Sequence, residues 1–109
     1  MDSMNLASKN PNRISIPKAQ LAEFCRHHHI RKLAFFGSVL SDSFGPESDV
    51  DVLVEFEPGH TPGLRLIQIQ DELSVLLGGR KVDLVTPKFL NKRIRDQVLA
   101  QAVVQYARR

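Results

Sequence analysis

Four residues in the first half of this 109-residue chain have the types and spacing needed to bind phosphate and metal. Gly37 and Ser38 end one strand-like run, and Asp49 and Asp51 open another after ten intervening residues. Glycine lets a backbone approach a phosphate closely, and a serine that opens a helix either offers an anion site or simply caps the helix. Residues two apart on a strand share a face, so Asp49 and Asp51 would present two carboxylates to a cation.

A third carboxylate lies on a later strand-like run. Asp83 sits among apolar residues at 81–86, as Asp51 does at 49–56. A charged residue inside an apolar strand needs a partner, and a metal ion is a suitable one. Asp49 has a simpler alternative as a strand-end or turn residue.

The spacing of apolar residues predicts the elements that position these groups. We expect a helix at 17–29, strands at 32–36, 49–56 and 81–86, and helices at 38–43, 64–77 and 90–107. The first two strands could form a hairpin-like pair. Val50, Val52 and Val54 should face away from the aspartates, with Leu53 on their side. Residues 1–14 lack periodicity and are expected to be a flexible leader before a single domain at 15–109.

The Gly-Ser pair, the ten-residue interval, Asp-x-Asp and Asp83 on a later strand together resemble the DNA polymerase beta-like nucleotidyltransferase superfamily. More closely, the pattern is similar to the minimal nucleotidyltransferases (MNT) that are the antitoxins of HEPN/MNT toxin–antitoxin pairs. The resemblance covers roughly residues 17–107. It implies an α/β (α+β) fold, a small mixed β-sheet backed by helices. It also implies that Asp49, Asp51 and Asp83 hold two Mg²⁺ ions while Gly37 and Ser38 bind the phosphates of ATP.

The function implied by the resemblance is transfer of AMP from ATP to a hydroxyl, on a tyrosine, of a partner HEPN-type ribonuclease toxin in a hetero-oligomer. The chain is too short for a separate acceptor-binding domain, which disfavours a small-molecule acceptor. The alternative is a non-catalytic antitoxin that neutralises the toxin by complex formation. One departure concerns Ser41, because related sequences often carry Arg or Lys there. Nucleotide affinity would then be lower, or another basic residue would substitute.

Composition excludes several other classes of protein. The single cysteine, Cys25, excludes an internal disulfide, favours a reducing cytoplasm, and is expected to pack in the core. No apolar stretch approaches the ~20 residues that span a membrane. One tyrosine, no tryptophan and no interleaving of basic with aromatic residues disfavour direct nucleic-acid binding.

Charge is segregated along the chain. Residues 42–57 contain six acidic residues and no Lys or Arg, whereas residues 80–109 contain eight basic residues and two acidic ones. This asymmetry favours one acidic and one basic surface. Three adjacent histidines, at 27–29, are expected in the last turn of the first helix, where they point in different directions and cannot jointly bind one metal ion.

Overall fold

The computed structural model describes residues 16–40, 45 and 48–108. The leader expected at 1–14 and the departure at Ser41 lie outside these described residues. Within them, no helix is both long enough and apolar enough to cross a membrane.

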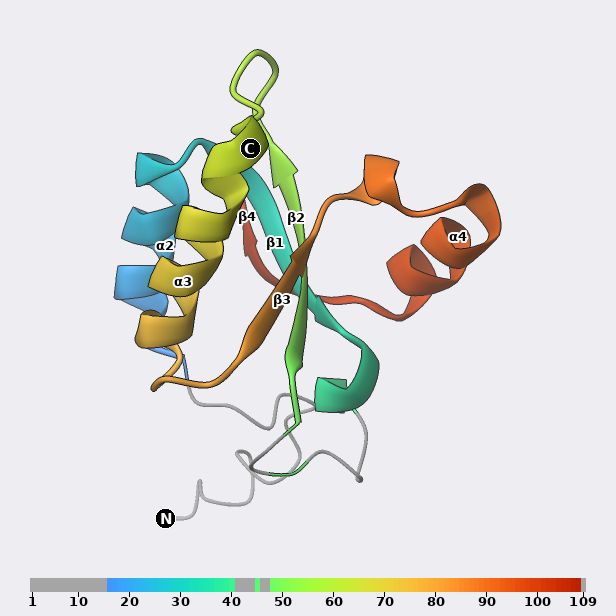
Figure 1. Cartoon of the computed structure of the whole chain (residues 1–109), viewed down its shortest axis with the longest axis horizontal. Helices are drawn as coiled ribbons and strands as arrows, with labels where there is room; N and C mark the ends of the chain where they lie inside the picture. The colour runs from blue at the N-terminus through green and yellow to red at the C-terminus, as the bar shows by residue number, and fades with distance from the viewer. Residues whose placement is uncertain (1–15, 41–44, 46–47, 109) are drawn as a thin grey trace.

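A four-stranded sheet in the order β3-β2-β1-β4 forms the centre of the described structure (Figure 1). Its strands are β1 (Ile30–Phe36), β2 (Val50–Phe56), β3 (Val82–Val85) and β4 (Val103–Ala107). β1 pairs antiparallel with both β2 and β4, whereas β2 and β3 run parallel. The sheet is therefore mixed, and both the predicted fold class and the antiparallel pairing of the first two strands are confirmed.

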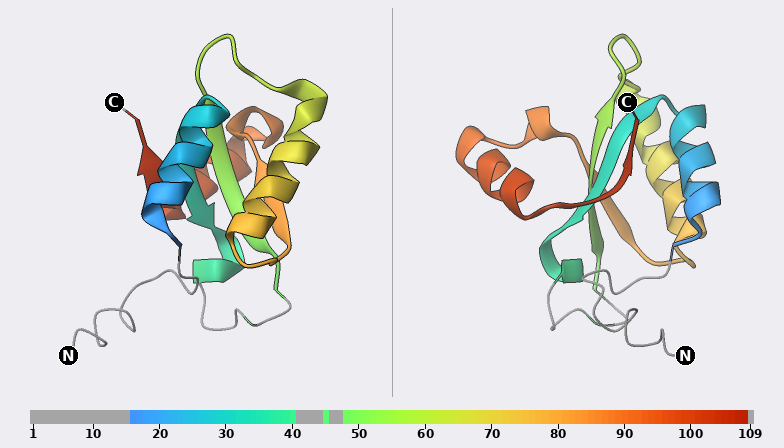
Figure 2. Two further views of the ribbon diagram at one scale, coloured as in Figure 1. Left: turned by 90° about the vertical axis from the view of Figure 1, so that its left-hand side faces the viewer. Right: turned by 180° about the vertical axis from the view of Figure 1, so that it is seen from behind.

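Helices α2 (Lys18–His27) and α3 (Leu66–Leu76) lie side by side on one face of the sheet (Figure 2). The β2 residues Val50, Val52 and Val54 are fully buried in the core on this face, as predicted. The helices contribute Leu21, Cys25, Ile69 and Leu73 to the same cluster. Each such aliphatic side chain contributes roughly 1.5–3 kcal/mol by leaving water, so this face holds much of the fold's stability.

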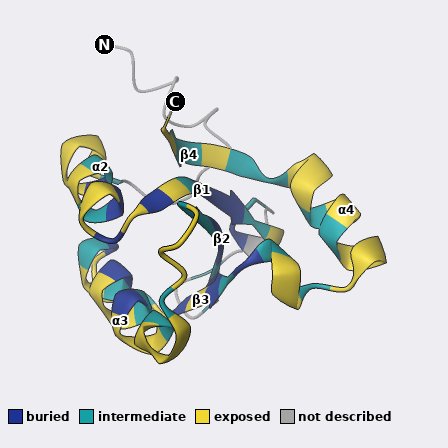
Figure 3. Ribbon diagram, turned by 90° about the horizontal axis from the view of Figure 1, so that it is seen from above, coloured by how far each residue is buried: buried dark blue, intermediate teal, exposed yellow. Residues whose placement is uncertain are grey.

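The opposite face of β2 carries Asp51 and Leu53. Leu53 is buried but lies outside the core cluster formed with α2 and α3. On this side of the sheet are the 3₁₀ turn η3 (Pro87–Phe89) and helix α4 (Lys92–Gln101), seen in Figures 1 and 3. Helix α4 has no buried residue. The covering of this face by η3 and α4 thus buries far less than the covering of the other face by α2 and α3.

The helix predicted at 90–107 is wrong in its second half. Helix α4 ends at Gln101, Ala102 is extended with φ −64° and ψ 141°, and β4 follows. Tyr106 of β4 pairs with Leu33 of β1. The four-residue spacing that suggested one long helix was overridden, because β-branched and aromatic residues favour a strand and β1 offered unpaired backbone groups to a neighbour.

The first helix is shorter than predicted, and only one of the three histidines belongs to it. α2 ends at His27, His28 is its C-cap, and His29 has a positive φ of 59°. A left-handed residue ends a helix and redirects the chain, so β1 begins at Ile30 rather than residue 32. His28 is buried, and its Nε2 lies 2.8 Å from Oε1 of Glu72 on α3.

Helix α3 also starts later than predicted. The 3₁₀ turn η2 (Gly63–Arg65) precedes it. Gly78 and Gly79 follow with φ of 80° and 86°, which confirms the predicted stop after the helix. The buried face of α3 runs through Ile69 and Leu73, and Ile67 is 64% exposed.

Candidate active site

The two halves of the sequence motif meet where β1 ends beside β2. Phe36, the last residue of β1, pairs with Asp51. Gly37 follows with φ 74°, and a Cβ added there would overlap the carboxylate oxygen Oδ2 of Asp51 and lie 3.2 Å from its Cγ. Glycine is therefore required both by the backbone conformation and by the close approach. The predicted phosphate-binding residue lies directly against a predicted metal ligand.

Asp83 lies beside Asp51 on the neighbouring strand. The parallel register of β2 and β3 pairs these two residues directly, and paired strands lie about 4.8 Å apart. Their flanking residues Val50, Val82 and Leu84 are buried on the α2–α3 side, so alternation sends both carboxylates to the other face. Asp51 is half-buried and Asp83 is exposed, an arrangement open to solvent and to a substrate.

Asp49 is exposed and lies one residue before β2 rather than on it. The next residue is fixed, since the N–H of Val50 donates to the carbonyl of Lys81 at 2.8 Å. A turn precedes it, with the N–H of Ser48 donating to the carbonyl of Gly45 at 3.1 Å. The backbone on both sides of Asp49 is therefore held, while its carboxylate remains accessible.

Ser38 lies in η1 (Gly37–Leu40), a 3₁₀ turn where an α-helix at 38–43 was expected. The side chain of Ser38 and residues 41–43 lie outside the described part of the chain. Val39 is fully buried in the core cluster and anchors the turn. The backbone of this turn is thus fixed next to the Asp51 carboxylate.

Arg80 belongs to this region and was missed by the sequence analysis. Its Nη2 donates to the carbonyl of Gly45 at 2.6 Å, and its own carbonyl accepts from Ser74 Oγ at 2.5 Å. Arg80 therefore ties the segment before Asp49 to the connection between α3 and β3. Nothing in the sequence signals the link, because it joins residues 35 positions apart.

Cys25 does not supply a nucleophile. Its side chain is fully buried in the core, as predicted. Burial raises the pKa of the thiol from 9.0 to about 12, although the nearby Arg26 charge lowers it somewhat. The thiol therefore stays protonated near neutral pH, and the thiolate is the reactive form.

Residues 18–105 match the model of the family described as the nucleotidyltransferase domain. This span includes all five candidate site residues and almost every described element. The chain belongs to the nucleotidyltransferase domain family. Membership implies a nucleoside triphosphate substrate and a divalent metal in general terms.

Relatives of this nucleotidyltransferase match most of its length. The protein adenylyltransferase MntA of Thermococcus cleftensis is 37% identical over 90 residues, which cover 82% of this chain and 88% of MntA. A solved structure described as a minimal nucleotidyltransferase is 32% identical, with a TM-score of 0.67 and coverage of 94% and 95% of the two chains.

A more distant structure shares the fold of this nucleotidyltransferase. It is a rebuilt structure of the tri-AMPylated HEPN toxin of Shewanella oneidensis in complex with MNT antitoxin. The match is 20% identical, covers 83% of this chain and 69% of that chain, and has a TM-score of 0.57.

The residues where β1 ends and where β2 and β3 begin fit the metal and nucleotide that the family implies. Asp51 and Asp83, side by side on parallel strands, supply the carboxylate oxygens that Mg²⁺ prefers. Glycine at position 37 lets the Asp51 carboxylate lie directly against the turn, where a Cβ would overlap it. The site therefore combines a hard-cation ligand set with an exposed backbone turn suited to phosphate oxygens.

Proposed function

We propose that this chain is an Mg²⁺-dependent protein adenylyltransferase, and that its acceptor is a hydroxyl, on a tyrosine, of a HEPN-type ribonuclease toxin. In that role it is the toxin's antitoxin and acts in the cytoplasm. The observation that carries the proposal is the contact of Gly37 with Asp51, beside Asp83, in a chain 37% identical to a protein adenylyltransferase.

The proposed reaction is an in-line displacement at the α-phosphorus of ATP. The acceptor oxygen forms a bond to that phosphorus, the bond to the β-phosphate bridging oxygen breaks, and pyrophosphate leaves. Two Mg²⁺ ions, when bound, lower the acceptor's pKa and neutralise the leaving group. Asp49, Asp51 and Asp83 hold the ions, and Asp83 also helps to take up the acceptor's proton. The Gly37 N–H and Ser38 orient the β- and γ-phosphates.

The acceptor is proposed to dock on the side of the sheet that carries Asp51. Large apolar side chains on η3 and α4 are exposed there: Phe89 is 72% exposed, Ile94 44% and Leu99 41%. Exposed apolar residues on these two consecutive elements favour a protein contact. We name Phe89, Ile94 and Leu99 the α4 arm and propose that it binds the HEPN partner next to the transfer site.

A non-catalytic antitoxin is the second candidate. The exposed α4 arm favours it, because such a surface could neutralise a toxin by contact alone. The two candidates differ in their dependence on the carboxylates. A transferase needs Asp49 and Asp51 charged, whereas a contact inhibitor needs only the folded surface.

Intact-mass measurement of the partner separates the candidates. A HEPN-type toxin is incubated with this chain, with Mg²⁺ and with each nucleoside triphosphate in turn. The Asp49→Asn/Asp51→Asn double variant serves as the comparison, and Asp71→Asn, an exposed aspartate on α3, as the matched control.

We expect the partner to gain one or more AMP masses with ATP, with the wild-type chain and with Asp71→Asn, but not with the double variant. Equal toxin neutralisation by the wild type and the double variant, with no mass gain in either, would establish the contact inhibitor instead. A mass gain with another nucleotide would identify that nucleotide as the donor and would still support nucleotidyl transfer to the partner.

A further inference from the structure

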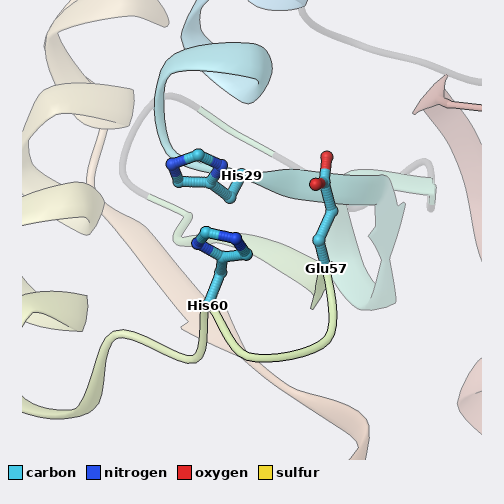
Figure 4. Close-up of side chains that lie close together, drawn as sticks. All are labelled: His29, Glu57 and His60. Atoms are coloured by element: carbon cyan, nitrogen blue, oxygen red, sulfur yellow. The ribbon is translucent and has the colours of Figure 1, made fainter.

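A second cluster of ligand-bearing side chains lies at the other end of β1 and β2 (Figure 4). His29, Glu57 and His60 each offer one donor atom, and these atoms all lie within 4.8 Å of one another. His29 comes from the turn between α2 and β1, while Glu57 and His60 come from the loop after β2. The sequence draws attention only to the adjacent histidines at 27–29. It gives no sign of this group, which the strand pairing brings together.

Backbone hydrogen bonds hold the three residues next to one another. The N–H of Glu57 donates to the carbonyl of His29 at 2.8 Å, and the N–H of His60 donates to the carbonyl of Glu57 at 3.0 Å. The rings of His29 and His60 stack, with centroids 3.9 Å apart and planes at 18°. The donor groups therefore start close together, and the ordering cost of gathering them around an ion is reduced.

The two rings border a cavity with room for the water ligands of a bound ion. A cavity of about 370 Å³ is lined by both rings together with Arg65 and Ile69. Both histidines are exposed, and Glu57 is half-buried. Glu57 also forms an ion pair with Arg108 through Oε2. Because a carboxylate has two oxygens, the other one remains for a metal while Arg108 keeps its partner.

The donor set selects a transition metal rather than Mg²⁺. Two imidazole nitrogens and one carboxylate oxygen suit Zn²⁺, whose fourth position water then fills. Mg²⁺ takes oxygen ligands and favours the carboxylates at the other end of the strands. We propose that His29, Glu57 and His60 form a zinc-binding site that links the α2–β1 turn to the loop after β2.

This site is separate from the transfer site. The seven residues of β1 lie between His29 and Gly37, a span of roughly 25 Å at about 3.3 Å per residue. A zinc ion there contacts neither the aspartates nor a nucleotide bound to them. It stabilises the two loops, and the proposal stands whether or not the chain transfers AMP.

Zinc affinity measured against a chromogenic chelator tests the proposal. The full, untagged, metal-free chain is titrated with ZnCl₂ in excess Mg²⁺, so that Mg²⁺ occupies the carboxylates at the other end. We expect one zinc per chain. His29→Asn and His60→Gln should each weaken binding on the order of 10–100-fold, and His27→Gln, the exposed neighbour on α2, should not.

The variants are chosen to keep the fold. Asparagine tolerates the positive φ at position 29 better than most residues. Thermal unfolding without zinc should therefore be similar in all variants, and zinc should raise the midpoint by a few degrees in wild type and His27→Gln alone. Imidazole NMR signals of His29 and His60, but not of His28, should shift on zinc binding.

Two results would overturn the zinc site. One is unchanged zinc affinity in both His29→Asn and His60→Gln. The other is loss of zinc binding in Asp51→Asn with retention in the histidine variants, which would place the ion at the aspartates.

Discussion

The two faces of strand β2 are built for opposite purposes. One face places Val50, Val52 and Val54 in a core sealed by α2 and α3. The other presents Asp51 beside Asp83 and is accompanied by α4, which has no buried residue. Alternation along one strand thus delivers apolar and acidic groups to separate environments within two residues. The first face supports the fold so that the second can tolerate charge.

The comparison predicts that changes on the two faces are separable. A residue on the helix-covered face should change the free energy of unfolding and affect transfer only through the fraction folded. A residue on the aspartate face should change transfer and leave unfolding nearly unaltered. Four variants, each with a control, test this separation.

Asp51→Asn should have the largest effect, on activity. We expect the rate of AMP transfer to fall on the order of 10²–10³-fold, because the Mg²⁺ that would neutralise the developing phosphate charge loses a carboxylate ligand. The free energy of unfolding, from urea denaturation, should change by less than about 1 kcal/mol. Asp71→Asn on α3 should change neither. Equal transfer rates in Asp51→Asn and Asp71→Asn would contradict a role of the Asp51 face in AMP transfer.

Leu73→Ala should have the largest effect on stability. Leu73 is fully buried between α3 and the sheet, so the substitution leaves a cavity and should cost about 2–5 kcal/mol. Val75→Ala on the same helix removes a side chain that is 77% exposed and should cost less than about 1 kcal/mol. Urea midpoints check both values. The folded fraction of Leu73→Ala should transfer AMP at the wild-type rate.

Gly37→Ala should lower both the free energy of unfolding and the rate of AMP transfer, because Gly37 has a left-handed backbone and lies against the Asp51 carboxylate. A left-handed conformation costs a non-glycine residue about 1–2 kcal/mol, and the added Cβ displaces the Asp51 carboxylate. Transfer should fall at least about tenfold. Gly78→Ala provides the control, because Gly78 also has a positive φ, of 80°, but a Cβ added there would meet no other atom within 4 Å. It should show a similar stability cost with normal transfer, and a matching loss of transfer would exclude a special role for Gly37.

The Ile94→Ser/Leu99→Ser double variant should have the smallest effect, confined to partner binding. These α4 side chains are 44% and 41% exposed, so unfolding should change by less than about 1 kcal/mol. The Kd for the HEPN partner, from calorimetry, should rise about tenfold as apolar contact is lost. Ile67→Ser, on the opposite side of the sheet, should bind normally. Weaker binding of Ile67→Ser instead would move the partner to the α2–α3 side.

Local pattern was enough to predict most of the sheet. The alternation of β2 correctly predicted which side chains enter the core, because a strand's period does not depend on its neighbours. The last element was predicted wrongly, since a stripe at four-residue spacing fits a helix while the same residues in β4 pair well with β1. Strand pairing is a long-range contact that periodicity cannot reveal.

The candidate transfer site divides in the same way. Gly37, Asp49, Asp51 and Asp83 could be selected from their types and spacing alone. The tether from Arg80 to Gly45 and the cluster of His29, Glu57 and His60 could not, because each joins distant segments through the fold. The positive φ of His29 also had no signal in a run of three histidines expected to be helical.

The sequence by itself determined the acidic motif and the positions of the first three strands, since these depend on residue type and short-range period, and the resemblance that the motif carries implied the mixed sheet backed by helices. Tertiary structure alone decided that Asp83 lies beside Asp51, that Gly37 lies against the Asp51 carboxylate, and that residues 103–107 form a strand. The physical reason is that register and close approach are set by pairing and packing among all the strands at once, and no single segment encodes them.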